Sequence, residues 1–94
     1  MGIIYKLTSP SGKIYIGQTT RTLEARYREH CCGYEKSIIS SAIKKYGSDN
    51  IIREIIYECN NNELDENEIK YIKHYSSLEP NGYNIKTGGS SGNK

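Results

Sequence analysis

The stretch LDENEIKYIKHY, residues 64 to 75, predicts an amphipathic helix whose apolar side is interrupted by one acid. At about 3.6 residues per turn, Glu68 lies in the middle of the face that the apolar side chains share. Those side chains are Leu64, Tyr71, Ile72 and Tyr75. A carboxylate that faces the body of a protein is costly, and local rules often fail where a residue has a function. Glu68 is therefore either a helix-edge glutamate that pairs with an arginine, or a metal ligand or catalytic base.

The 94-residue chain has the length of one domain with a modest core, and its charges are unevenly distributed. Through Arg53 it has nine Lys or Arg and four Asp or Glu, whereas Glu54 to Glu79 has seven acids and two lysines. The first half can therefore face phosphates while the second supplies carboxylates. Because β-rich sequence begins directly after Met1, we expect no signal peptide and no membrane contact, and a soluble protein of the cytoplasm or nucleus.

The first two elements are predicted to form an antiparallel hairpin. Two β-rich segments, Ile3 to Thr8 and Lys13 to Gln18, flank the turn-forming sequence Ser-Pro-Ser-Gly at residues 9–12. The register of this hairpin decides where its tyrosines point. Tyr5 and Tyr15 share a face only if the residues paired across the hairpin have numbers with an even sum.

Two helices are predicted after the hairpin. Thr20 or Thr22 can cap a first helix that runs to about His30. A second helix begins after Ser37, which can cap it, and ends at Gly47, a residue typical of helix ends.

The rest of the chain completes an α+β domain. Ile51 to Cys59 is rich in β-branched residues and predicts a third strand, and the asparagines at 60–62 can cap the helix of Glu68. Tyr83 to Ile85 predicts a short segment that returns to the sheet. We therefore expect a small three-stranded antiparallel sheet flanked by three helices, in the order β-β-α-α-β-α, over residues 1–86. Residues 87–94 are rich in Gly and Ser and predict a flexible tail or the start of a linker.

One set of residues is distributed over these elements in an order that is typical of a known family. The set consists of Tyr5, Tyr15-Ile16-Gly17, Arg26, Glu68 and the closing Gly82-Tyr83-Asn84-Ile85. Its order and spacing resemble the GIY-YIG nuclease superfamily, above all the homing-endonuclease and phage or viral catalytic domains. The resemblance implies the GIY-YIG endonuclease fold and a metal-dependent hydrolysis of DNA phosphodiester bonds, in which one metal ion and a tyrosine assist the attack of water.

The resemblance also implies roles for individual residues. The catalytic residues that it implies are Tyr5, Tyr15, Arg26, His30, Glu68 and Asn84. Glu68 would be the protein ligand of Mg²⁺ or Mn²⁺, ions that keep several waters and take other contacts from phosphate. An arginine at position 26 can give two fixed donors to phosphate oxygens. Tyr5 would act as base or position the water with Tyr15 in support, or the two roles are reversed. We expect four residues to contact the substrate: Lys13, Gly17, Arg26 and Arg28.

Gly2 departs from the family motif. It lies one residue earlier than the glycine of the usual GIY motif, so the resemblance does not carry the turn-forming role over to it.

Other functions stay open on the sequence alone. Two alternatives are a non-cleaving nucleic-acid-binding module on the same fold and a nuclease of repair or branched DNA. A third is a structural domain, which leaves the position of Glu68 unexplained. We expect DNA as partner, and a C-terminal DNA-binding region beyond these residues or a free-standing nuclease of low selectivity.

Overall fold

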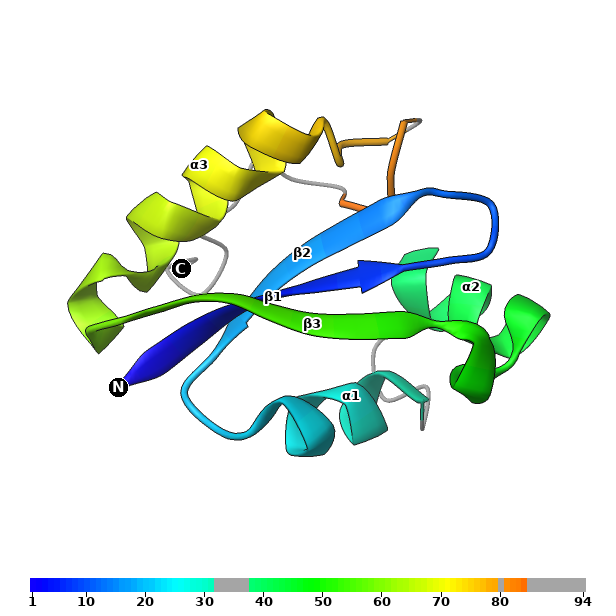
Figure 1. The fold of residues 1–94 in the computed structure, drawn as a ribbon, viewed down its shortest axis with the longest axis horizontal. Helices are drawn as coiled ribbons and strands as arrows, with labels where there is room; N and C mark the ends of the chain where they lie inside the picture. Colours follow the sequence, from blue (N-terminus) through cyan, green and yellow to red (C-terminus); the bar gives the residue numbers. More distant parts are fainter. Residues whose placement is uncertain (32–37, 80, 85–94) are drawn as a thin grey trace.

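The computed structural model describes residues 1–31, 38–79 and 81–84, and it arranges three antiparallel strands between helices (Figure 1). The strands are β1 (Gly2–Thr8), β2 (Ile14–Thr19) and β3 (Ile52–Cys59). The helices are α1 (Leu23–Cys31), α2 (Ile38–Tyr46) and α3 (Leu64–Tyr75), with short 3-10 turns at Ser48–Asn50 and Asn61–Glu63. The α+β class and the order β-β-α-α-β-α are therefore confirmed.

The hairpin has the register that places Tyr5 and Tyr15 on one face of the sheet. β1 is the central strand, in the order β2-β1-β3, and both of its neighbours run antiparallel to it. Tyr5 lies opposite Gly17 and Leu7 lies opposite Tyr15. Residues that face each other across a ladder project to the same side, so Tyr5 and Tyr15 share a face.

The helices cover both faces of the sheet, and the alternation of β1 divides the core into two clusters. α1 and α2 lie on one face and α3 lies on the other (Figure 1). The first cluster contains Tyr5, Leu7, Tyr27, Ile39, Ala42, Ile43, Ile51 and Tyr83. The second contains Ile4, Ile16, Cys59, Leu64 and Ile72. Neighbouring residues of β1 therefore anchor opposite layers.

The ends of the helices confirm some of the expected caps and correct one. The backbone N–H of Ala25 donates to Thr22 Oγ1 at 3.1 Å, so Thr22 caps α1. Gly47 ends α2 with a φ of 94°. The residue before α3 is Glu63, without a side-chain cap, so the asparagine cap was wrong. Asn61 and Asn62 instead lie in the 3-10 turn before α3, and Asn60 precedes that turn. Ser37 lies outside the described residues.

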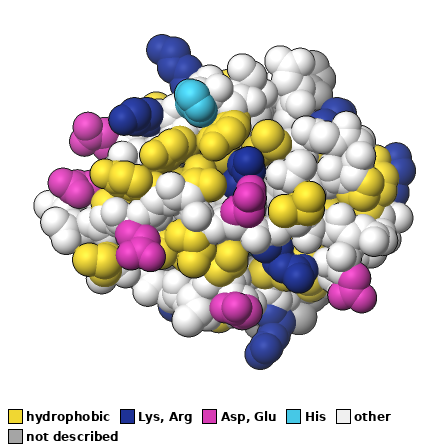
Figure 2. All heavy atoms as spheres, in the orientation of Figure 1, with side chains coloured by type: hydrophobic (Ala, Val, Ile, Leu, Met, Phe, Trp, Pro, Cys, Tyr) yellow, Lys and Arg dark blue, Asp and Glu magenta, His cyan; other side chains and the backbone are white. Residues whose placement is uncertain are grey.

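β3 is an edge strand with apolar side chains on its surface. Ile52, Ile55 and Tyr57 are 59%, 49% and 43% exposed. Figure 2 shows hydrophobic side chains interspersed with charged ones on the face that carries β3. No helix of the described residues has the length and the apolar character that a membrane span requires.

Two residues near the end of the described chain return to the sheet, as the sequence predicted for this segment. The N–H of Tyr83 donates to the carbonyl oxygen of Ile14 at 2.9 Å, and Asn84 bonds to Ile16 with its side chain. The segment therefore covers part of the outer edge of β2. Ile85 and the predicted tail at 87–94 lie outside the described residues.

Candidate active site at the edge of β2

Tyr5 is the centre of a group of side chains that three elements bring together. It is fully buried, and its hydroxyl lies 3.0 Å from Nε2 of His30, which α1 contributes. The ring of Tyr15, from β2, lies 6.2 Å from the ring of Tyr5 and 5.4 Å from the imidazole of His30, centroid to centroid. Two tyrosines and a histidine from positions far apart in the sequence thus form one contact group.

Gly17 makes room for this arrangement. A Cβ atom at this position would meet Cζ and the hydroxyl of Tyr5, and would lie 2.9 Å from Cε2 of Tyr15. Because real Cβ atoms do not approach other atoms this closely, only glycine allows the ring of Tyr5 to lie across β2. The space beside Gly17 is therefore filled by the rings of Tyr5 and Tyr15.

Gly2, the displaced glycine of the motif, also serves a close approach. It lies within β1, and a Cβ there would come within 2.5 to 2.8 Å of the side chain of Leu64. The glycine therefore lets the first turn of α3 pack directly on β1. Its role in this chain is packing within a strand, with no positive φ.

The surroundings of Tyr5 keep its hydroxyl protonated. Burial is the largest cause that raises the pKa of Tyr5 well above its ordinary value of 10.0, and Tyr15 adds to it. The guanidinium of Arg26 acts in the opposite direction, by its charge and by hydrogen bonding, and the carboxylate of Glu68 raises the pKa further. At neutral pH Tyr5 is therefore a neutral phenol, and both Arg26 and Glu68 affect its pKa.

Helix α1 directs Arg26 and His30 to the same side, because they are four residues apart. Nη1 of Arg26 donates to Oε1 of Glu29 at 2.9 Å, and Arg21 also pairs with Glu29. These hydrogen bonds, from Arg21 first and then Arg26, lower the pKa of the Glu29 carboxyl. Arg28 is exposed, and its position on the helix directs it to another side than Arg26.

Glu68 approaches the same edge of β2 from the opposite layer. Its side chain is buried, with only 5% exposed. Nε2 of Gln18 donates to Oε1 of Glu68 and to Oδ1 of Asp65, both at 2.8 Å. The sequence analysis missed both Gln18 and Asp65. The signals available were the position of Gln18 directly after Tyr-Ile-Gly and the three-residue spacing of Asp65 and Glu68, which puts both on one side of α3.

The donors around Glu68 are compatible with a hard divalent cation. Among the described residues, no group of three or more His, Cys, Asp and Glu side chains converges as a ready metal site. Mg²⁺ needs no such cage, because it binds through one or two carboxylates together with waters and substrate phosphates. The carboxylates of Glu68 and Asp65 fit that pattern, since both accept a hydrogen bond from the same nitrogen, Nε2 of Gln18.

Asn84 is engaged with the backbone of β2. Its Oδ1 accepts from the N–H of Ile16 at 2.8 Å and from Oγ of Ser77 at 2.6 Å, while its Nδ2 donates to the carbonyl oxygen of Ile16 at 2.8 Å. The amide thus bonds to β2 as a neighbouring strand would.

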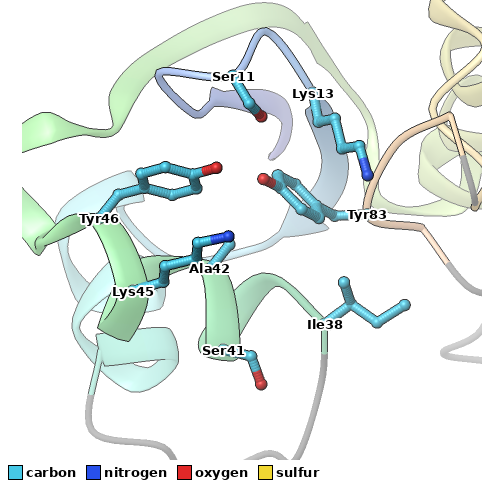
Figure 3. Close-up of a pocket in the computed structure, with 8 residues that line it drawn as sticks. All are labelled: Ser11, Lys13, Ile38, Ser41, Ala42, Lys45, Tyr46 and Tyr83. Atoms are coloured by element: carbon cyan, nitrogen blue, oxygen red, sulfur yellow. The ribbon is translucent and has the colours of Figure 1, made fainter.

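Lys13 lies at a different place from the tyrosine group. It is exposed directly before β2 and lines a pocket of about 310 Å³ between the hairpin turn and α2 (Figure 3). Of the residues expected in the site, the structure brings together Tyr5, Tyr15, Gly17, Arg26, His30 and Glu68. Asn84 bonds to the backbone of Ile16 in the same strand, whereas Lys13 lines a separate pocket and Arg28 is exposed on another side of α1.

Comparisons with known proteins bear on the family and the fold of this chain. The family model of the GIY-YIG catalytic domain matches residues 1–84. Among solved structures, the catalytic domain of the homing endonuclease I-TevI has a similar fold, with a TM-score of 0.72 and 24% sequence identity, over 92% of this chain and 99% of that one. The curated proteins contain no significant match. This chain belongs to the GIY-YIG family and is an endonuclease catalytic domain.

Proposed function

We propose that this endonuclease hydrolyses DNA phosphodiester bonds with one divalent metal ion, and that Tyr5 and His30 together handle the proton of the attacking water. One observation carries the proposal. The hydroxyl of Tyr5 lies 3.0 Å from Nε2 of His30 while Arg26 and Glu68 both act on its pKa. This contact and these two effects on the pKa of one hydroxyl support the proposal.

The raised pKa of Tyr5 argues for a relay in which no free phenolate forms. The phenol oxygen accepts a proton from water while its own proton passes to Nε2 of His30, in the tautomer that carries a lone pair there. This route avoids the cost of a buried phenolate. Tyr15, whose ring packs against both partners, keeps the phenol and the imidazole in this orientation.

Arg26 and Glu68 supply the charges of the proposed site. Arg26 stabilises the extra negative charge that develops on the phosphate, and Glu29 fixes the orientation of its guanidinium. Glu68, held by Gln18, is the proposed ligand of Mg²⁺ or Mn²⁺. When bound, the ion supplies charge neutralisation at the phosphate and lowers the pKa of a coordinated water. Asn84 has an indirect role in the proposed site, because its side chain bonds to the backbone of the strand that carries Tyr15.

The test is nicking of supercoiled plasmid by the unmodified chain, by Glu68→Gln and by Glu66→Gln. Glu66 is an exposed acid two residues away on α3, so it matches the loss of charge without touching Gln18. We expect magnesium-dependent nicking that falls at least a hundredfold in Glu68→Gln, since it removes the proposed ligand, and that stays within twofold in Glu66→Gln. Circular dichroism checks that each variant is folded.

Two results would contradict the proposal. Nicking that survives Glu68→Gln in a folded variant would place the metal elsewhere. Nicking without any divalent ion, in the presence of chelator, would exclude the metal-dependent route altogether.

The biological type that we propose is a homing or phage nuclease, supported by the similar fold of the I-TevI catalytic domain. The alternatives within the family are nucleases of repair or of branched DNA. A catalytic domain with a net charge of +2 binds DNA weakly, so sequence selectivity would come from a further DNA-binding region. Plain duplex is then the expected substrate of this domain.

A further inference from the structure

The pocket between the hairpin turn and α2 has the chemistry of a site for a sugar-phosphate chain. Its volume is about 310 Å³, and its walls include an alanine and two tyrosine rings. The side chains that carry the argument are Ser11, Lys13, Ala42, Lys45, Tyr46 and Tyr83. Figure 3 shows the hydroxyl ends of Tyr46 and Tyr83 pointing toward one another, with Ser11 above them.

The charged groups at this pocket are of one sign. Among the described residues that line it, the ionised side chains are Lys13 and Lys45. The ammonium of Lys45 lies 5.3 Å from the ring centroid of Tyr46, which holds it at the wall of the pocket. An apolar floor between two ammonium groups suits a sugar with a phosphate on either side.

A chain of hydroxyl groups directs a further donor into the pocket. The hydroxyl of Tyr83 donates to Oγ of Ser9 at 2.8 Å, and Oγ of Ser9 lies 2.8 Å from Oγ of Ser11. Because Ser9 already accepts from Tyr83, its own proton can go to Ser11. The proton of Ser11 is then available for an anionic oxygen in the pocket.

We propose that this pocket binds a sugar-phosphate segment of the DNA substrate, with its phosphates on Lys13 and Lys45, away from the bond that is cut. The inference rests on the proposed function, because it takes DNA as the substrate. The pocket and Tyr5 lie on the same side of the sheet, since Tyr83 and Ala42 belong to the cluster of Tyr5.

The position of the pocket sets its distance from the cut. Gln18, beside Glu68, and Lys13 are separated along β2 by five residues, which correspond to about 17 Å of extended strand. At about 3.4 Å per base pair, this distance spans about five base pairs. The pocket therefore contacts DNA about half a helical turn from the scissile phosphate.

The experiment measures duplex binding by fluorescence anisotropy in EDTA, so that no cleavage occurs, at several salt concentrations. It compares the unmodified chain with Lys45→Ala, Lys13→Ala and the control Lys44→Ala. Lys44 is an exposed lysine of the same helix that does not line the pocket, so it matches the change in net charge. Thermal melting checks that the variants are folded.

We expect Lys45→Ala and Lys13→Ala each to weaken binding about five- to tenfold at 0.1 M salt. Each should reduce the slope of log affinity against log salt by about 0.9, the value for one phosphate contact. Lys44→Ala should change affinity less than twofold. Equal effects of Lys45→Ala and Lys44→Ala would overturn the proposal even if the chain nicks DNA. A specific effect of Lys45→Ala in a chain that does not nick would keep the pocket and reject the nuclease mechanism.

Discussion

At the scale of single residues, the site depends on one tyrosine that is both buried and neutral. Tyr5 is placed by the register of the hairpin and by the missing side chain of Gly17. Its hydroxyl has a partner in His30, so burial does not leave it unsatisfied. The same burial that makes a phenolate costly keeps the hydroxyl protonated, so that it can donate to the imidazole of His30.

The raised pKa of Tyr5 predicts a specific pH dependence of stability. The folded chain keeps the proton of Tyr5 above pH 10, where the unfolded chain loses it. The raised pKa of Tyr5 therefore contributes to the free energy of unfolding. This contribution is complete below the pKa of Tyr5 in the unfolded chain, and it is lost as pH rises toward the pKa of Tyr5 in the folded chain. Tyr5→Phe should therefore reduce the fall of the free energy of unfolding above pH 10, by up to about 1.4 kcal/mol per pH unit.

Urea unfolding at a series of pH values from 8 to 11 measures this effect. Tyr57→Phe is the control, because it removes a hydroxyl from a ring that is 43% exposed. The control should follow the unmodified chain. Parallel curves for Tyr5→Phe and the unmodified chain would show that burial of Tyr5 does not favour its protonated form.

At the scale of elements, local patterns were sufficient for the helices and strands. The run at 64–75 has helical spacing, and α3 has those bounds with Glu68 buried in its apolar face. The even-sum register could be stated from the sequence but not chosen, because the loop length was open. The contacts of Gln18 and Asn84 could not be predicted. Gln18 and Glu68 are 50 positions apart in the sequence, and Ile16 and Asn84 are 68 positions apart. The periodicity of a sequence gives information on neighbours within one helix or strand, and not on contacts between distant segments.

The segment that ends at Asn84 acts as a partial fourth strand, which gives a prediction for the element. Asn84→Ala leaves the N–H and carbonyl of Ile16 without their partners, and Ser77 loses its acceptor. Buried groups without partners cost about 1 to 3 kcal/mol each, so with three such groups we expect a loss of at least about 3 kcal/mol in the free energy of unfolding. Chemical denaturation measures it.

Asn81→Ala is the matched control, because Asn81 is an exposed residue of the same segment. Its variant should unfold within about 0.5 kcal/mol of the unmodified chain. Hydrogen exchange of the Ile16 amide should accelerate in Asn84→Ala alone. A variant as stable as the control would mean that the amide of Asn84 contributes nothing to holding β2.

At the scale of the whole molecule, the uneven charge of the sequence becomes a difference between layers. The basic first half forms β1, β2, α1 and α2, and the acidic part at 54–79 contains most of β3 and all of α3. α3 lies on the opposite face of the sheet from α1 and α2 (Figure 1). We therefore expect DNA to approach from the side of the hairpin and α2, while Glu68 and Asp65 contact Gln18 of β2 from the side of α3.

A domain that holds DNA through a few phosphate contacts recognises the backbone, and it has little means to recognise a branch point. We therefore expect this chain to cut plain duplex and a four-way junction of the same sequence at rates within about twofold. With two or three phosphate contacts, both rates should fall about ten- to fortyfold between 50 and 200 mM salt. Single-turnover cleavage of labelled substrates measures both, with Glu68→Gln as the blank. A junction that is cut ten times faster than duplex, with a shallower dependence on salt, would assign the chain to the nucleases of branched DNA and reject the homing type.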